Sequence, residues 1–434
     1  MWKFVILFFL FTSLFATPLV IKDNMQVAYQ PSQKASSLEE FFSKGNLYSR
    51  LRLTYIGFDY KRLPSKSALR AGGSFIYKSA FLKGVAGTLG FYSSHVLDKN
   101  KMRKHLEGDV VAEAFVEYRR ELIDLKAGRQ LFESVFTKSN DTKMIPNGFS
   151  GYSLEIGPKR LFYKAAYFTS QKLRDRTDYH DVITYGKNGN DDSAANRVFS
   201  LTNLSKAHKK GHHSLFVNEL KAHLGRWKFL LNYTKVSDLY ALAAQEIGYS
   251  FKVGRISCAP SFRFVEQFDQ GAKDLALPIA NLKGDARGYK DPFSVDSKGW
   301  NGRVDVRDGF WSLRVAYSKI FDKADFITPW RGFPTGGYTR LMGQYNWYAN
   351  TSSYLVKAKL RLPSAIHTTL AYAYENYDEK KPAVPSDRGV AYFDIIKRFQ
   401  GVFAKLRFER VNAKSKPNDK GSYSECRAEI SYLF

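Results

Sequence analysis

The chain has 434 residues, a formal net charge of +26 and 15% aromatic residues, with 34 Phe and 27 Tyr. With a mean hydropathy of -0.36, this composition is unusual for a soluble enzyme and typical of a β-barrel that has an apolar exterior, aromatic girdles and a polar lumen. The charge would suggest nucleic-acid binding in an intracellular protein, but a secretion signal and the lack of a suitable helical or aromatic module argue against that class.

Residues 1–16 are predicted to be a secretory signal peptide. Lys3 precedes a short apolar run, and small residues lead to Ala16 and a cleavage point before Thr17. The run is too short to cross a hydrocarbon core, which takes about 20 helical residues, and no second long apolar run follows. A buried N-terminal strand or helix is the alternative interpretation.

Residues 17–45 are predicted to form a periplasmic segment with one short helix over residues 37–44. Ser37 and Glu40 have the spacing of a capping box, and Gly45 can end the helix. The alternative is a frayed segment without a helix.

From residue 46 to residue 434 the sequence predicts an all-β fold, a transmembrane antiparallel β-barrel. Leu51 and Leu53 fall on one face of the first strand, and Arg50 and Arg52 fall on the other. The same alternation recurs in residues 112–119, 255–264, 311–318, 353–362 and 402–409. At roughly 20 residues per strand and connection, we expect about 18 strands, with about 16 as the alternative.

Long polar stretches between these segments are predicted to be extracellular loops, and the connections at the other end to be short periplasmic turns. The longest predicted loops cover residues 171–213, 267–301 and 376–396.

The last segment reads as a membrane strand with a terminal aromatic residue. Counting back in twos from Phe434 gives Tyr432 and Ile430, while Glu429 and Arg427 fall between apolar positions. It resembles the C-terminal signature by which bacterial outer-membrane barrels are recognised for assembly. We therefore expect the protein in the bacterial outer membrane, inserted by the barrel assembly machinery.

Basic residues fall repeatedly on the faces that the alternation assigns to the lumen. Rows of Lys and Arg favour anions in a water-filled pore, and a low-dielectric wall focuses their field along the channel. Alternatively, some of these cations pair with lumen glutamates or bind lipid phosphate at the rim. The predicted pore-lining residues are Arg50, Arg52, Arg255, Arg263, Arg314, Lys357, Lys359, Arg361, Lys405, Arg407 and Arg427.

Other chemically active groups do not form a convincing site. His208, His212 and His213 have a spacing that could hold a transition metal, but no carboxylate or Cys accompanies them in the sequence. Cys258 and Cys426 lie far apart and are expected to be separate thiols, with a disulfide as the alternative. No nucleotide-binding or hydrolase motif occurs, so we expect no enzyme activity, metal or cofactor.

One segment carries a family resemblance. Residues 125–136 read LKAGRQLFESVF, and residues 140–152 read NDTKMIPNGFSGY. This segment resembles the region of OprD-type outer-membrane porins in which a strand ends and a loop with a basic-x-x-Pro…Phe-x-Gly pattern folds into the pore. The glycine-rich residues 84–91 look like that family's early strand. The predicted helix and the strand after it are closer to the family's epsilonproteobacterial branch.

The resemblance implies a barrel of about 18 strands, a constriction made by inward-folded loops, and a ladder of basic side chains that guides carboxylate-bearing solutes. It implies that Asp141, Lys143 and Pro146 lie in the constriction loop. Lys143 stands where the family usually has Arg. The alternative for these residues is an ordinary Asp-containing turn near a proline.

The predicted function is therefore passive, weakly selective diffusion of small hydrophilic solutes, anionic or carboxylate-bearing ones in particular. An adhesin or receptor barrel and an outer-membrane lipid hydrolase are the alternatives. The expected partners are outer-membrane lipid and lipopolysaccharide, the assembly machinery and the small solutes, but not nucleic acid. The homotrimer and the monomer both remain open.

Overall fold

A computed structural model describes residues 20–22, 26–28, 32–102, 107–139, 144–184, 199, 201–209, 211–281, 283–330, 332–333, 337–343, 346–399, 401–414 and 421–434. The predicted signal peptide, residues 1–16, lies outside the described residues. A short hairpin of β1 (Val20–Lys22) and β2 (Gln26–Ala28) precedes the main body of the structure.

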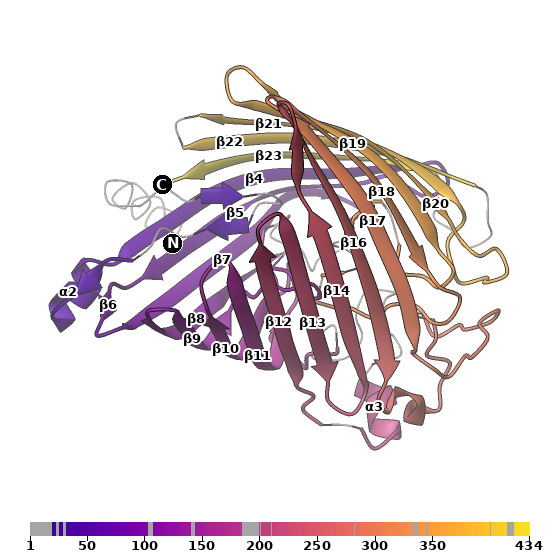
Figure 1. The fold of residues 1–434 in the computed structure, drawn as a ribbon, viewed down its shortest axis with the longest axis horizontal. Helices are drawn as coiled ribbons and strands as arrows, with labels where there is room; N and C mark the ends of the chain where they lie inside the picture. The colour runs from indigo at the N-terminus through magenta and orange to yellow at the C-terminus, as the bar shows by residue number, and fades with distance from the viewer. Residues whose placement is uncertain are drawn as a thin grey trace.

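The main body is a closed barrel of 18 long antiparallel strands (Figure 1). The predicted all-β transmembrane barrel with about 18 strands is therefore confirmed. The strands are β4 (Asn46–Tyr60), β5 (Lys66–Lys78), β7 (Val85–Asn100), β8 (Gly108–Arg120), β9 (Ile123–Gln130), β10 (Gly148–Ile156), β11 (Leu161–Lys172), β12 (Leu215–Leu224), β13 (Trp227–Val236), β14 (Tyr240–Tyr249), β16 (Ile256–Asp269), β17 (Ser297–Asp308), β18 (Trp311–Ile320), β19 (Ser352–Leu362), β20 (Ile366–Asn376), β21 (Arg388–Phe399), β22 (Val402–Ala413) and β23 (Tyr423–Leu433).

Short elements supplement these strands. β15 (Phe251–Val253) continues the ladder between β14 and β16, and β3 (Lys34–Ala35) pairs in parallel with β6 (Phe81–Leu82). The helical elements are α2 (Leu38–Ser43), α3 (Leu201–Lys206) and the 3-10 turn η4 (Ala272–Leu275). The helix expected over residues 37–44 is thus present as α2. In the described part of the chain, no helix is long and apolar enough to span a membrane.

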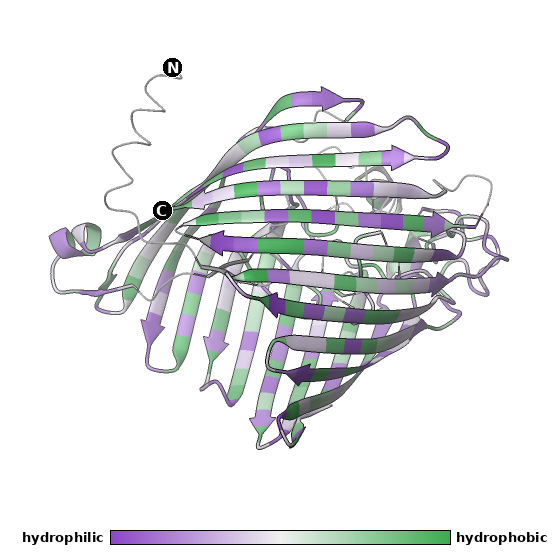
Figure 2. Ribbon diagram, turned by 90° about the horizontal axis from the view of Figure 1, so that it is seen from above, coloured by the Kyte–Doolittle hydropathy of each residue, from purple (hydrophilic) through white to green (hydrophobic). Residues whose placement is uncertain are grey.

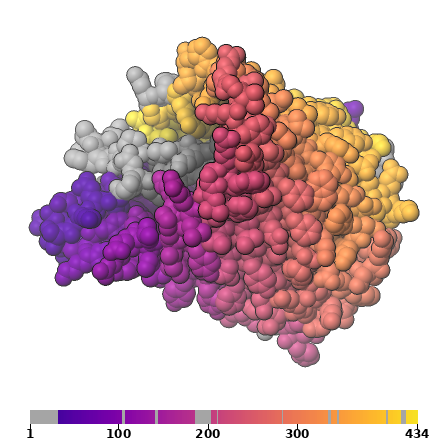
Figure 3. All heavy atoms as spheres, viewed as in Figure 1, coloured from indigo at the N-terminus to yellow at the C-terminus, as the bar shows by residue number. Residues whose placement is uncertain are grey.

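Period-2 alternation separates the two faces of the barrel wall. On β4, Leu51 and Leu53 are 38% and 42% exposed, whereas Arg50 and Arg52 are 1% and 4% exposed. Because successive strand residues point to opposite faces, the apolar side chains lie outside and the arginines lie inside. Figure 2 shows the same mixture of hydrophilic and hydrophobic residues along the strands, and in Figure 3 the strands between β12 and β17 form a continuous outer surface.

The two ends of the barrel differ in the length of their connections. Two-residue turns join β8 to β9 and β12 to β13 at the end where the chain terminates, while the long connections, such as residues 270–296 and 321–351, lie at the other end. This asymmetry is typical of outer-membrane barrels, with turns in the periplasm and loops outside the cell. A barrel of this architecture with an apolar outer belt belongs in the bacterial outer membrane, as the sequence predicted.

The loop predictions agree with the structure at two places and in part at a third. Long loops cover residues 173–214 and 270–296, close to the predicted ranges. Of the predicted loop over residues 376–396, residues 377–387 are loop and residues 388–396 belong to strand β21. Val390 and Asp394 of β21 both face inward, although one is apolar and the other is charged. The sequence of β21 therefore lacks a clear alternation of apolar and polar residues. The long loop over residues 321–351 was missed because its Trp330 and Phe333 made it look less polar than a surface loop.

Candidate pore lining and constriction

Ten of the eleven predicted pore-lining cations lie on inward-facing strand positions, as their alternation with lipid-facing neighbours shows. The exception is Arg255, which lies in the turn between β15 and β16 with its side chain 85% exposed and paired with Asp308. Arg255 is therefore at the barrel end and not on the wall.

Several wall cations are held in ion pairs with inward-facing carboxylates. Glu429 on β23 lies 2.6 Å from Arg50 and 3.0 Å from Arg52, and all three side chains are buried. Arg314 on β18 binds Asp305 on β17 through two nitrogens, at 2.7 and 3.0 Å. Such pairs fix the side chains and neutralise part of the lumen charge. The same pattern joins Arg263 to Glu246 and Arg427 to Glu425.

A second group of wall cations lacks such partners. Among the described residues, none of their side chains forms an ion pair with a carboxylate. The group consists of Lys357, Lys359 and Arg361 on β19 and Lys405 and Arg407 on β22, and we call it the cationic strip.

The strip spans the sheet from β19 to β22, and the two strands between contribute Thr369 and Asp394 at the same level. The register pairs Lys359 with Thr369, Thr369 with Asp394, and Asp394 with Arg407. Asp394 is the carboxylate closest to the middle of the strip, and it accepts a 2.6 Å hydrogen bond from Tyr392. The neighbouring carboxylates Glu409 and Glu429 already bind Met342 N and the arginines of β4, so the five cations around Asp394 leave this side of the lumen positively charged.

The sequence analysis missed further inward-facing arginines, among them Arg70 and Arg303. Arg70 on β5 is 2% exposed and lies 3.5 Å from Asp175, and Arg303 on β17 lies 3.4 Å from Asp305. The glycine pair at Gly72 and Gly73 interrupts the alternation after Arg70. The residues around Arg303 alternate with Val304 and Val306 and could have been recognised as a strand.

The 131–147 loop between β9 and β10 folds into the barrel. The backbone nitrogen of Val135 donates to the Glu219 carboxylate on the inner face of β12, at 2.8 Å. At the other end of the loop, Met144 N donates to Asp175, which pairs with Arg70 on β5. The 131–147 loop is therefore bound directly to β12 and, through Asp175 of the 173–214 loop, to Arg70 on β5.

Of the predicted constriction residues, Pro146 is buried in this loop. Its carbonyl oxygen accepts a hydrogen bond from the Lys172 ammonium group at the end of β11. Asp141 and Lys143 lie outside the described residues. Their assignment to the constriction stays a prediction.

The 321–351 loop between β18 and β19 also enters the barrel and joins the first loop. Phe333 N donates to Val135 O at 2.7 Å, and Gly332 N donates to Phe136 O at 3.0 Å. A Cβ on Gly332 would lie 2.0 Å from the Phe136 carbonyl carbon, so only glycine permits this approach. We call the two joined loops the inner partition.

The inner partition is anchored to strands β16, β17 and β22 as well. The Tyr338 ring lies between the guanidinium groups of Arg263 and Arg303, 4.8 and 4.1 Å from its centroid. Met342 N donates to the Glu409 carboxylate on β22 at 3.0 Å. A buried apolar cluster fills the space between the loops and the wall, and it includes Phe136, Phe333 and Val217. These contacts narrow the lumen with a fixed structure.

The histidine cluster does not form a metal site within the part of the chain that the structure describes. One carboxylate does accompany it, contrary to the sequence-based expectation, because Asp181 approaches from the preceding segment. Its Oδ2 lies 3.1 Å from His213 Nδ1 and accepts a hydrogen bond from His213 N. This contact fastens the start of β12 to the 173–214 loop.

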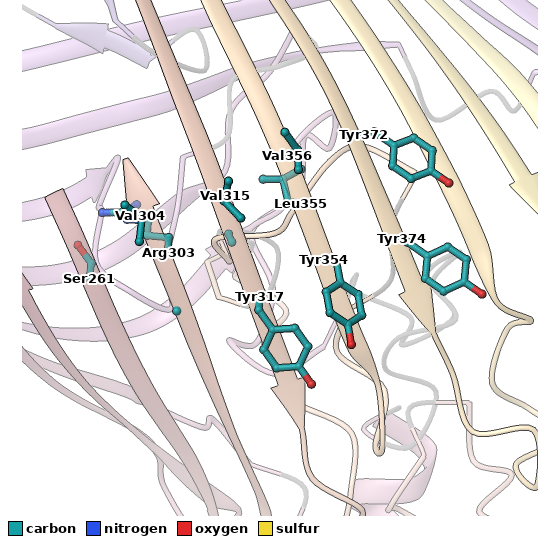
Figure 4. Close-up of a pocket in the computed structure, with 12 residues that line it drawn as sticks. Ser261, Arg303, Val304, Val315, Tyr317, Tyr354, Leu355, Val356, Tyr372 and Tyr374 are labelled. Atoms are coloured by element: carbon teal, nitrogen blue, oxygen red, sulfur yellow. The ribbon is translucent and has the colours of Figure 1, made fainter. Parts of the chain in front are cut away.

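An apolar groove of about 550 Å³ lies on the outer face, where Gly302 leaves the surface hollow. Tyr317, Tyr354 and Tyr374 line it from three neighbouring strands (Figure 4). Val315 and Val356 in the groove are each 51% exposed, so it faces lipid and is not part of the lumen. Rings at this position are typical of an aromatic girdle.

Solved structures share this architecture. The outer membrane protein OpdK from Pseudomonas aeruginosa has 13% identity with a TM-score of 0.71, and the match covers 91% of this chain and 99% of OpdK. OccK3 (OpdO) from the same organism has 15% identity and a TM-score of 0.68, over 92% and 97% of the two chains. The chain has the OprD-type porin fold.

At this identity the likeness concerns the fold. No family model matches the sequence, and a search of curated proteins finds no match. The porin fold confirms the resemblance that residues 125–152 carried. The assignment to the epsilonproteobacterial branch stays a prediction.

Proposed function

We propose that this barrel is a passive channel for small hydrophilic solutes and that it prefers anions, including carboxylates. The observation that carries the proposal is the cationic strip, whose five side chains lack carboxylate partners among the described residues. Unpaired Lys and Arg in a pore attract anions and repel cations.

The inner partition places the solute close to these charges. The loop region that holds Tyr338 and Met342 contacts β16, β17 and β22, and Met342 Sδ lies 2.9 Å from Arg407 Nη1 of the strip, so the inner partition borders the strip directly. A narrow path beside a charged wall increases selectivity because a hydrated ion cannot stay a Debye length of about 8 Å away from it.

The similarity to a carboxylate-binding relative of the same fold supports the preference. OpdK has been crystallised with vanillate, in a structure that matches this chain with a TM-score of 0.72. Vanillate carries a carboxylate, which is the functional group that the cationic strip would attract.

The decisive experiment is single-channel recording of the refolded protein in planar bilayers, with reversal potentials measured across a salt gradient. We expect stable channels whose reversal potential has the sign of an anion-selective pore. Cation selectivity would retain the channel and refute the anion preference. Folded barrels without conductance would favour the adhesin, receptor or lipid hydrolase alternatives.

A further inference from the structure

The short helix α2 lies outside the barrel wall. Tyr77 occupies an outward-facing position on β5, between the buried inward-facing residues Ile76 and Lys78. Its hydroxyl donates a 2.7 Å hydrogen bond to Phe42 O at the end of α2. A Cβ on Gly45, just after the helix, would lie 2.4 Å from the same hydroxyl oxygen. Figure 1 draws α2 at the outer edge of the barrel, beside β6 and at the end with the short turns.

The helix has a sharply divided surface. Leu38 and Phe42, four residues apart, are 66% and 59% exposed, and no residue of the helix is buried. At about 100° per residue, Phe41, Leu38 and Phe42 occupy one continuous arc. Glu39 and Glu40 lie on the opposite side.

The orientation of this apolar arc is fixed by local bonds. The Ser37 hydroxyl caps the helix by accepting from Glu40 N at 3.2 Å. Glu40 pairs with Lys44 at 2.8 Å, and Ala80 N next to β6 donates to Phe41 O at 3.0 Å. The helix therefore holds two large apolar side chains away from the barrel in a defined direction.

The neighbouring exterior of the barrel is apolar at the same end. Val85, the first residue of β7 and the register partner of Leu82 on β6, is 40% exposed, and Leu122 in the turn after β8 is 56% exposed. These residues belong to the surface that the membrane covers. The apolar arc of α2 continues that surface beyond the end of β5.

We propose that α2 is an interfacial anchor whose Leu38 and Phe42 enter the phospholipid leaflet on the periplasmic side of the outer membrane. Short amphipathic helices lie in this way at the boundary between headgroups and acyl chains. The acidic side of the helix then faces water. The proposal does not depend on what passes through the lumen.

The test uses the full-length protein with Cys258→Ser and Cys426→Ser, labelled with an environment-sensitive fluorophore at Phe42→Cys. The matched control carries the label at Glu39→Cys, on the polar side of the same helix. Both are refolded into vesicles of phosphatidylethanolamine and phosphatidylglycerol with brominated acyl chains. We expect at least about twofold stronger quenching at position 42 than at position 39. A label at Leu38→Cys repeats the test if the first variant does not fold.

Equal quenching at both positions, with equal access to aqueous iodide, would mean that α2 lies in the periplasm and would overturn the proposal. A label at position 42 that is shielded from iodide but not quenched by brominated chains would also overturn it. In that case the helix contacts protein, such as a second copy of the chain.

Discussion

Arg50 on β4 and Glu429 on β23 form an ion pair across the seam that closes the barrel, with 2.6 Å between Arg50 Nη2 and Glu429 Oε1. The two residues are 379 positions apart in the chain. Arg52 binds the same carboxylate, so one glutamate holds two arginines at the junction of the first and last long strands.

We expect Glu429→Gln to destabilise the barrel, because it removes a buried negative charge that lies within 3.0 Å of two buried guanidinium groups. Breaking a buried pair in this way costs about 3 kcal/mol or more. Urea unfolding of the refolded protein in detergent, followed by tryptophan fluorescence, measures the loss. Asp285→Asn removes an exposed ion pair with Arg287 and should change stability by about 0.5 kcal/mol or less. Equal stability of the two variants would contradict the importance of the seam.

The cationic strip should dominate ion selectivity. Replacing Lys357, Lys359 and Lys405 with Gln removes three charges that carboxylates do not offset in the described structure, so the reversal potential should move towards the cation side. Lys159→Gln, at an exposed turn between β10 and β11, should leave it nearly unchanged. If both variants shift the potential alike, the selectivity comes from overall charge and not from the strip.

Gly332→Ala should loosen the inner partition. The added methyl group would collide with the backbone of Phe136, so the two loops must separate. We expect a higher or noisier single-channel conductance with an unchanged barrel circular dichroism spectrum. Gly211→Ala is the matched control, since a Cβ there has no neighbour within 4 Å. Wild-type conductance in Gly332→Ala would show that the contact does not limit the pore.

Lys381 should stabilise the outer loops in a pH-dependent way. Its ammonium group is 1% exposed, lies 2.6 Å from Asp322 and also binds Asp378. Burial alone would raise the pKa values of the Asp322 and Asp378 carboxyl groups, but the hydrogen bonds from Lys381 lower both pKa values below their usual range. A folded pKa below the unfolded one gives stability that is present at neutral pH and is lost as the pH falls below about 4.

Amide hydrogen exchange of residues 377–387 tests this in the wild type and in Lys381→Met. We expect faster exchange in the variant at neutral pH and convergence of the two proteins in acid, after correction for intrinsic rates. A difference that persists unchanged in strong acid would assign the effect to packing of the lysine stem and not to its charge.

The strands of the barrel wall were predictable from sequence because each strand has one face towards lipid and the other towards the polar lumen. Leu53 beside Arg52 on β4, or Leu406 beside Arg407 on β22, allows only one assignment of faces. The N-terminal cap of α2 joins Glu40 N to the Ser37 hydroxyl, two residues close together in the sequence. Helix α2 could be predicted for that reason. Strand β21 was mistaken for a loop because apolar Val390 and charged Asp394 both face inward.

The lumen was less predictable, because its contacts join distant segments. Whether Arg50 or Lys357 is neutralised depends on strand register, which brings Glu429 to one and not to the other. The 321–351 loop was missed because Trp330 packs in the buried cluster inside the barrel, which no periodic pattern signals. The sequence identified ten of the basic residues on the wall, and only the folded barrel distinguishes paired from unpaired ones.

The seam between β4 and β23 also determines the order of assembly. Ser49 and Phe434 exchange backbone hydrogen bonds there, so the ring cannot close until the last strand has emerged. Until then β4 presents an open hydrogen-bonding edge, which invites aggregation, and closure must bring together residues at the greatest separation along the chain, which is slow. A barrel closed in this way leaves the edge of its first strand exposed for as long as the last strand is absent.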